Sequence, residues 1–171
     1  LFPYTTLFRS QMFDDWFVYV QGMSLLFLPA GVKLLFVLIG RAPAMLGIMA
    51  ASVYLGYGIW PDKSIVAVIK FAFISLMTYP VSAYLVMHWL QIKRDLVNLQ
   101  YWHIVLLSLA ASVTNGIVHN LLYVAEDITA PQEFWAKAAA MTFGDFMGCF
   151  VVVALFQLAV SHLGTQQASR D

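Results

Sequence analysis

Long apolar runs with almost no charge are the feature that most constrains how this chain folds. A helix needs roughly 20 apolar residues to cross the hydrocarbon core of a bilayer. Five runs reach or approach that length, and they cover Trp16 to Ile39, Ala42 to Trp60, Ser64 to Leu90, Leu99 to Val124 and Phe134 to His162. Backbone polar groups cannot stay unpaired in lipid, so these runs should be helices. The sequence therefore predicts an all-α, polytopic transmembrane bundle of about five spans.

The composition agrees with a chain whose main partner is the lipid bilayer. Apolar residues make up 61% of it and charged residues only 11%, whereas soluble domains have about 25% charged residues. The formal net charge is zero, which argues against nucleic-acid binding because that requires a basic face. A lone cysteine, Cys149, excludes a disulfide framework. His, Cys and carboxylate residues do not occur at zinc-binding spacings, so we expect no metal and no cofactor.

The first ten residues, Leu1 to Ser10, resemble the in-frame translation of a short-read sequencing adapter. We therefore expect this stretch to be non-native and expect native sequence upstream of Gln11 to be missing. The alternative is a short interfacial segment that is aromatic with one arginine. Residues 11–163 are then expected to form one transmembrane domain, and residues 164–171 a polar C-terminal tail.

The basic residues predict an orientation in the membrane. Arg41 and the pair Lys93-Arg94 lie in alternate connections and thus on one side, while the acidic connection from Glu126 to Glu133 lies on the other. Cytoplasmic loops are enriched in Lys and Arg. We expect a multi-pass protein of the bacterial inner membrane with its C-terminus in the cytoplasm.

The first apolar run contains a proline, a glycine and a lysine in close succession. Pro29 removes a backbone donor and crowds the preceding turn, so the run should be broken at Pro29 to Gly31. Broken helices within membranes are tolerated where they line a cavity. Lys33 follows the break. Its ammonium either extends to the cytoplasmic interface beside Arg41, or it faces the bundle and meets an anionic group.

Asp145 is the best candidate for that anionic group. It lies roughly ten residues from Trp135, which at 1.5 Å per residue places it about 15 Å deep. A carboxylate at that depth should face a partner or water. It is either an acid that titrates or binds a ligand, or an acid that only holds helices together.

A polar stripe marks the fourth run. Ser108, Ser112, Asn115 and His119 are spaced by four, three and four residues and share one helix face. The stripe either makes interhelical hydrogen bonds or lines a cavity in which Asn115 and His119 contact a ligand.

A stripe of small residues marks the fifth run. Ala136, Ala140, Gly144 and Gly148 recur every four residues, which allows another backbone to approach closely. The favoured interpretation is packing within the chain, and homodimerisation is the alternative.

Two stretches together resemble a known family. The segment Phe27 to Leu35 begins a Pro-x-Gly element that continues through Gly40, and Gly144 to Gly148 reads Gly-Asp-x-x-Gly. This combination resembles the MASE1-type bacterial integral membrane sensor domains, over most of Leu25 to Ala159. The resemblance implies a sensor that precedes a cytoplasmic output domain such as a histidine kinase. The chain departs from the family in having about five spans and no output domain after Asp171.

These observations favour a bacterial inner-membrane sensory or ligand-binding module without catalytic activity. Its small-molecule ligand would occupy a cavity lined by Lys33, Asn115, His119 and Asp145, and its protein partner would be a signalling output protein or a second copy. One alternative is a small transporter or the substrate-binding subunit of one. Another is a scaffold that docks a partner through the small-residue stripe. No constellation of residues indicates an enzyme.

Overall fold

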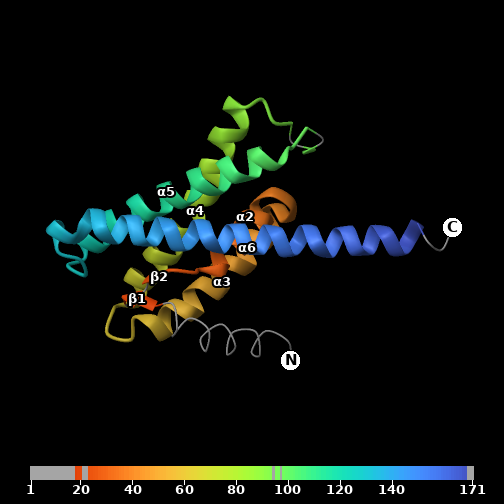
Figure 1. Cartoon of the computed structure of the whole chain (residues 1–171). Helices are drawn as coiled ribbons and strands as arrows, with labels where there is room; N and C mark the ends of the chain where they lie inside the picture. The colour runs from red at the N-terminus through yellow and green to blue at the C-terminus, as the bar shows by residue number, and fades with distance from the viewer. Residues whose placement is uncertain (1–17, 21–22, 94, 97, 169–171) are drawn as a thin grey trace.

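The computed structural model describes residues 18–20, 23–93, 95–96 and 98–168. Within these residues the fold is helical apart from loops and one short pair of strands, which confirms the all-α class (Figure 1). The stretch expected to be non-native, Leu1 to Ser10, lies outside the described residues. The elements in chain order are β1 (Val18–Val20), β2 (Met23–Ser24), α2 (Leu28–Leu35), the π-helical segment η1 (Phe36–Gly40), α3 (Arg41–Ile59), α4 (Ile65–Trp89), α5 (Tyr101–Ala125), the 3-10 turn η2 (Pro131–Glu133) and α6 (Phe134–Ala168).

Three of the described helices are long and apolar enough to cross a membrane. They are Ile65–Trp89 and Tyr101–Ala125, of 25 residues each, and the apolar part of the last helix, Pro131–Phe156, of 26 residues. At 1.5 Å per residue, 25 residues extend about 37 Å, against a hydrocarbon core of about 30 Å. Two further apolar helices, Leu28–Ile39 and Ala44–Ile59, are shorter. The membrane-protein class is thus supported by three full-length spans rather than by five.

The first expected span differs from the structure. Residues Val18–Val20 and Met23–Ser24 pair as antiparallel strands, and the helix begins only at Leu28. Pro29 therefore occupies the first turn of α2. Backbone N–H groups in the first turn have no partner within the helix, so the N–H that proline lacks is not needed there. The predicted break at Pro29 to Gly31 is wrong for this reason, because the proline starts a helix instead of interrupting one.

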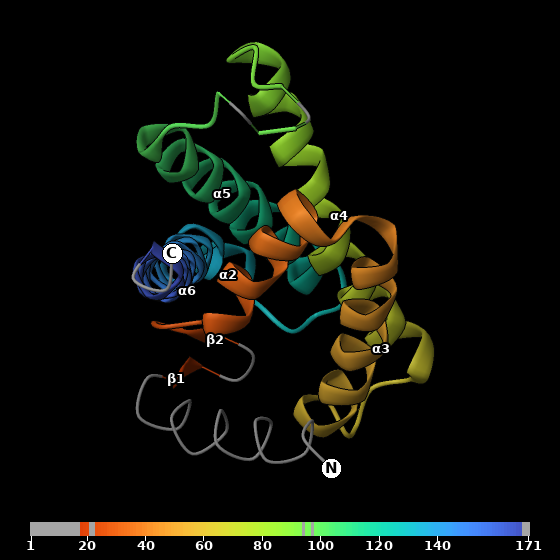
Figure 2. The ribbon, with the colours of Figure 1, turned by 90° about the vertical axis from the view of Figure 1, so that its right-hand side faces the viewer.

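The irregular backbone lies one turn further along the chain. Segment η1 follows α2 directly and leads into α3 without the loop that was expected at Gly40-Arg41. Figure 2 shows that α2 and α3 nevertheless run in different directions, with α3 alongside α4. At the other end of the chain, α6 continues past His162 to Ala168 and extends beyond the bundle (Figure 1).

Helices α2, α4, α5 and α6 build the core, with α6 against α5 and α2 and with α4 between α5 and α3. Two apolar clusters lie toward opposite ends of this core. The first cluster contains Ala30, Leu34, Tyr79, Ala83, Ile92, Leu107, Ala111 and Cys149. The second cluster contains Trp60, Ala67, Val68, Phe71, Tyr123 and Met141. Trp60, Phe71 and Tyr123 meet edge-on or tilted, with ring centroids 5.5–5.9 Å apart.

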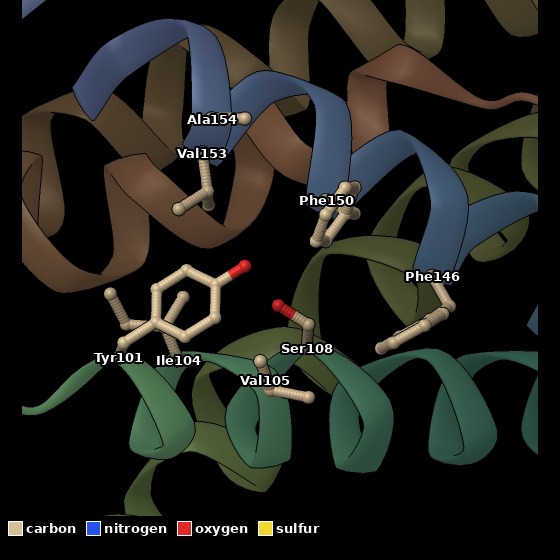
Figure 3. A pocket seen from close by; sticks show the side chains of 8 residues that line it. All are labelled: Tyr101, Ile104, Val105, Ser108, Phe146, Phe150, Val153 and Ala154. Atoms are coloured by element: carbon tan, nitrogen blue, oxygen red, sulfur yellow. The ribbon is translucent and has the colours of Figure 1, made fainter. Parts of the chain in front are cut away.

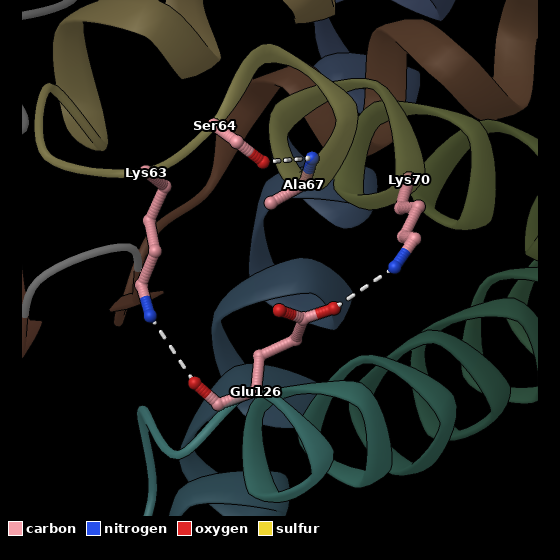
Figure 4. Close-up of polar contacts among 5 residues, drawn as sticks. All are labelled: Lys63, Ser64, Ala67, Lys70 and Glu126. Atoms are coloured by element: carbon pink, nitrogen blue, oxygen red, sulfur yellow. Dashed lines mark hydrogen bonds and ion pairs between the residues drawn. The ribbon is translucent and has the colours of Figure 1, made fainter.

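Polar contacts join two loops at the end of the bundle nearer the second cluster (Figure 4). The Lys63 Nζ donates to the backbone oxygen of Glu126 at 3.1 Å, and Lys70 pairs with the Glu126 carboxylate at 3.2 Å. The Ser64 side chain accepts from the Ala67 N–H and caps α4. The connections before α4 and after α5 therefore share one end, as consecutive antiparallel helices require.

Glycines bring α6 into contact with the segment before α2. The Phe27 N–H donates to the Gly144 carbonyl at 3.0 Å. A Cβ on Gly144 would overlap the Ser24 carbonyl oxygen, and one on Gly148 would overlap that of Phe27. Gly31 in turn faces Gly148 and Val152. These small residues are thus covered by backbone from the same chain.

Replacing Gly148 by alanine should destabilise the fold by about 1–3 kcal/mol, because the new methyl group overlaps backbone that cannot move by itself. The free energy of unfolding, measured by denaturing-detergent titration in micelles, tests this expectation. A matched control is Gly47→Ala in α3, where a Cβ meets nothing within 4 Å. That change should be neutral or stabilising, since alanine favours helix by up to about 1 kcal/mol. Equal losses at both positions would contradict the close-packing explanation.

Candidate functional site

A layer of buried polar side chains lies in the core, where it is interleaved with the first apolar cluster and extends toward the second. Each of the four core helices contributes to it, and its members are Lys33, Thr78, Ser82, Ser108, Ser112, Asn115, His119, Asn120 and Asp145. Thr78, Asn115 and Asp145 lie near the middle of helices long enough to span a bilayer. Ionisable and amide groups at that depth require partners inside the protein, and they mark functional sites in membrane proteins.

Asp145 on α6 is the centre of this layer and is 1% exposed. One of its carboxylate oxygens accepts from the Asn115 amide at 2.6 Å and from the Tyr79 hydroxyl at 3.2 Å. The Thr78 hydroxyl donates to the Asn115 side-chain oxygen at 3.0 Å. One carboxylate thus connects α6 directly to α4 and α5.

Lys33 on α2 faces the bundle and is only 5% exposed. Its ammonium donates to the Ser75 hydroxyl and lies 5.5 Å from the centroid of the Phe27 ring and 5.8 Å from that of Tyr79. Of the two interpretations of Lys33, this geometry matches the one in which the ammonium enters the bundle. The Ser75 hydroxyl and the two rings can hold an ammonium, while burial acts against its charge.

Lys33 and Asp145 do not form a direct ion pair. Their nitrogen and oxygen atoms are more than 4.0 Å apart, and the ion pairs within the described residues are Lys70–Glu126 and Lys137–Glu133. The two charges still interact at longer range. Contact between them was one of the two alternatives that the sequence left open, and the structure instead places each among neutral polar and aromatic side chains.

His119 adjoins the layer on the side of the second cluster. It is 5% exposed and meets the Tyr123 ring edge-on, with centroids 5.2 Å apart. Its Nδ1 atom has no hydrogen-bond partner, and the same holds for the Asn120 side-chain oxygen and the Ser82 hydroxyl. Unpaired polar atoms are costly when buried, so these groups indicate that the layer can accept further polar partners.

The predicted packing residues of α5 lie in the seam with α6, whereas the two predicted glycines of α6 lie against the segment before α2. The Ser112 carbonyl accepts a hydrogen bond from the Thr142 hydroxyl at 3.4 Å. On α6, Ala140 is half-buried, and Gly144 and Gly148 face the segment before α2. Figure 3 shows the hydroxyls of Tyr101 and Ser108 pointing toward one another across a void of about 10 Å³. A space of that size is about enough for one water molecule.

A second pocket between α5 and α6 is larger and apolar. Its volume is about 360 Å³, and its lining includes Leu109, Val113, Trp135 and Phe143. None of the four predicted ligand-binding residues lines either of these two pockets. The members of the polar layer are each at most 6% exposed, so a ligand there has to displace existing contacts.

Sequence reasoning missed the contribution of α4. Ser75, Thr78, Tyr79 and Ser82 are spaced by three, one and three residues, so they form a stripe on one helix face. This pattern is the counterpart of the stripe on α5, and it was detectable.

Chemically, the layer can bind polar or charged groups and can hold protons. It has no nucleophile activated by a base. Within the described residues, no three His, Cys, Asp or Glu side chains come together in a way that could hold a metal ion.

Compared with models of known protein families, with curated proteins and with solved structures, the chain matches none. The two stretches that resemble the MASE1-type domains do contact each other here. Phe27 and Gly31 belong to one of them, and both lie against Gly144 or Gly148 of the other.

Removing the Tyr79 hydroxyl should weaken the fold by about 1 kcal/mol, because interhelical hydrogen bonds in membrane proteins contribute about 0.6 and up to about 1.7 kcal/mol. The variant is Tyr79→Phe, and unfolding in micelles measures the change. Tyr84→Phe is the matched control, since Tyr84 lies on the same helix and is 64% exposed. A Tyr79→Phe variant as stable as the Tyr84→Phe control would show that the bond to Asp145 contributes nothing.

Proposed function

We propose that this protein is a non-catalytic sensory or ligand-binding module of a bacterial inner membrane, of the MASE1-like kind. The ligand site is the polar layer around Lys33, Asn115, His119 and Asp145, to which we add Tyr79. One observation carries the proposal. A single buried carboxylate is bonded to two other helices, and it sits on the helix that extends out of the bundle.

The length of α6 supports a role in passing a signal. This helix has 35 residues, or about 52 Å at 1.5 Å per residue, against about 30 Å for the hydrocarbon core. Asp145 lies in its first half, and the same continuous helix leads to Ala168. A ligand that shifts Asp145 relative to α4 and α5 would therefore move the far end of α6, where an output protein can detect it.

The transporter and scaffold interpretations each depended on a feature that the structure does not have. The transporter interpretation depended on a helix broken at Pro29 to Gly31, and α2 begins there instead. The scaffold interpretation needed a free small-residue stripe, whereas Gly144 and Gly148 are covered within the chain. Uptake into proteoliposomes separates a transporter from a sensor, since a sensor binds without net flux.

Replacing Asp145 by asparagine should abolish ligand response, because the amide keeps one oxygen for the bonds from Asn115 and Tyr79 but carries no negative charge and replaces the second acceptor oxygen by an NH2 donor. Thermal unfolding of the purified chain against a library of small metabolites identifies stabilising compounds, and the variant should lose their effect. Asp127→Asn is the matched control, because Asp127 is exposed and has a φ of 56°, which asparagine tolerates.

Spin labels then test the signal itself. The labels are attached to cysteines that replace Leu155 on α6 and Trp89 on α4, which are both exposed. The Cys149→Ala background removes the native cysteine, so the distance measured is the one between these two labels. A stabilising compound should change this separation in the wild-type site and leave it unchanged in the Asp145→Asn protein. A compound that binds while the separation stays constant would contradict signalling through α6.

We further propose that the C-terminus and the loop containing Lys93 are cytoplasmic. In the Cys149→Ala background, a membrane-impermeant maleimide should label Asp62→Cys in intact spheroplasts. Lys93→Cys should be labelled only after the membrane is opened. Both positions are exposed, so access from the two sides alone decides the result. Labelling of Lys93→Cys in intact spheroplasts would reverse the orientation.

A further inference from the structure

Two opposite charges are buried in the same layer without touching, and this separation indicates what the layer binds. Lys33 and Asp145 are 5% and 1% exposed, and no ion pair within 4.0 Å joins them. Buried charges are normally paired directly, because desolvation is repaid only by close contact. Here each charge is held by neutral groups, which are Ser75 for the ammonium and Asn115 with Tyr79 for the carboxylate.

The charge balance of the layer restricts the class of ligand. With Lys33 and Asp145 both ionised, the layer is neutral. Adding an anion or a cation would leave an uncompensated charge in a low-dielectric region, which is strongly unfavourable. A molecule that carries one charge of each sign adds none, and it can contact both groups at once.

The surroundings restrict the size of the ligand. The first cluster includes Leu34 and Leu107, and the second includes Phe71 and Tyr123, so apolar side chains flank the layer on both sides. The rings of Phe27 and Tyr79 lie beside the ammonium. His119 adds a buried Nδ1 atom that has no hydrogen-bond partner. These features suit a small molecule with a short polar body.

We propose that the polar layer binds a small zwitterion of the amino-acid type. The ligand carboxylate takes the Lys33 ammonium in place of Ser75, and the ligand ammonium binds the Asp145 carboxylate beside Asn115. His119 offers a further hydrogen bond. This inference rests on the proposed ligand-binding function and specifies its chemistry.

Binding of matched small molecules to the full chain in lipid nanodiscs tests the proposal. L-Alanine carries both charges, propionate lacks the ammonium, and ethylamine lacks the carboxylate. β-Alanine lengthens the distance between the two charges, and glycine keeps the distance found in L-alanine while removing the methyl group. We expect at least one of the three zwitterions to bind at least tenfold more tightly than propionate and ethylamine. This comparison uses the wild-type protein and does not depend on any variant folding.

Variants then assign the two ends of the ligand. Lys33→Met and Asp145→Asn should each reduce zwitterion affinity at least tenfold, whereas Lys70→Met should not change it, since Lys70 is an exposed lysine on the surface of α4.

The remaining outcomes overturn the proposal in distinguishable ways. Propionate or ethylamine binding as tightly as the zwitterions would show an anion or a cation site, and the ligand-binding function would stand with a different ligand class. Binding of none of the five probes, while other metabolites stabilise the chain through Asp145, would also overturn only the ligand class. Binding of none of the probes, together with no stabilising metabolite at all, would overturn both the zwitterion site and the proposed function.

Discussion

The bonds to the Asp145 carboxylate are the interaction on which the rest of this structure depends. Lipid is as apolar as the helix surfaces, so the hydrophobic effect does little to bring helices together once they are inserted. Close packing and hydrogen bonds must do it instead. Asn115 and Tyr79 donate to one carboxylate oxygen and so fix α4, α5 and α6 relative to one another. The aromatic and aliphatic clusters on either side fill the space that this arrangement leaves.

Glycine contacts supply the second constraint, and they act on the element that carries Lys33. The bond from the Phe27 N–H to the Gly144 carbonyl and the close approach at Gly148 place α2 directly on α6. Lys33 then enters the layer from a short helix, while Asp145 enters it from the longest one. The two charges are therefore held by different backbone contacts, and a change in the packing of α2 on α6 alters their separation without unfolding any helix.

The sequence predicted the helical class and the long spans because the backbone of a long apolar run in lipid must pair its polar groups within the run, as a helix does. It also identified Asp145, Asn115 and Lys33 as unusual, since charged and amide side chains are rare at that depth. The place of Pro29 at the start of a helix was not predictable in the same way. A proline interrupts a helix or starts one, and only the position of the preceding residues decides which. Tyr79 was missed because an aromatic ring fits the apolar pattern and its hydroxyl becomes informative only beside an acid.

The helix after η1 also bears on how the protein would respond to the thickness of a membrane. Helix α3 has 19 residues, about 28 Å of helix, against about 37 Å for α4 or α5 and about 30 Å of hydrocarbon. Its side chains Leu46, Tyr54 and Tyr57 are more than half exposed on the outside of the bundle. In a bilayer, α3 would match a thinner hydrocarbon layer than α4 and α5 do, and each ångström of mismatch costs a fraction of a kcal/mol. A change in bilayer thickness would then act on the position of α3 and, through η1, on the helix that carries Lys33.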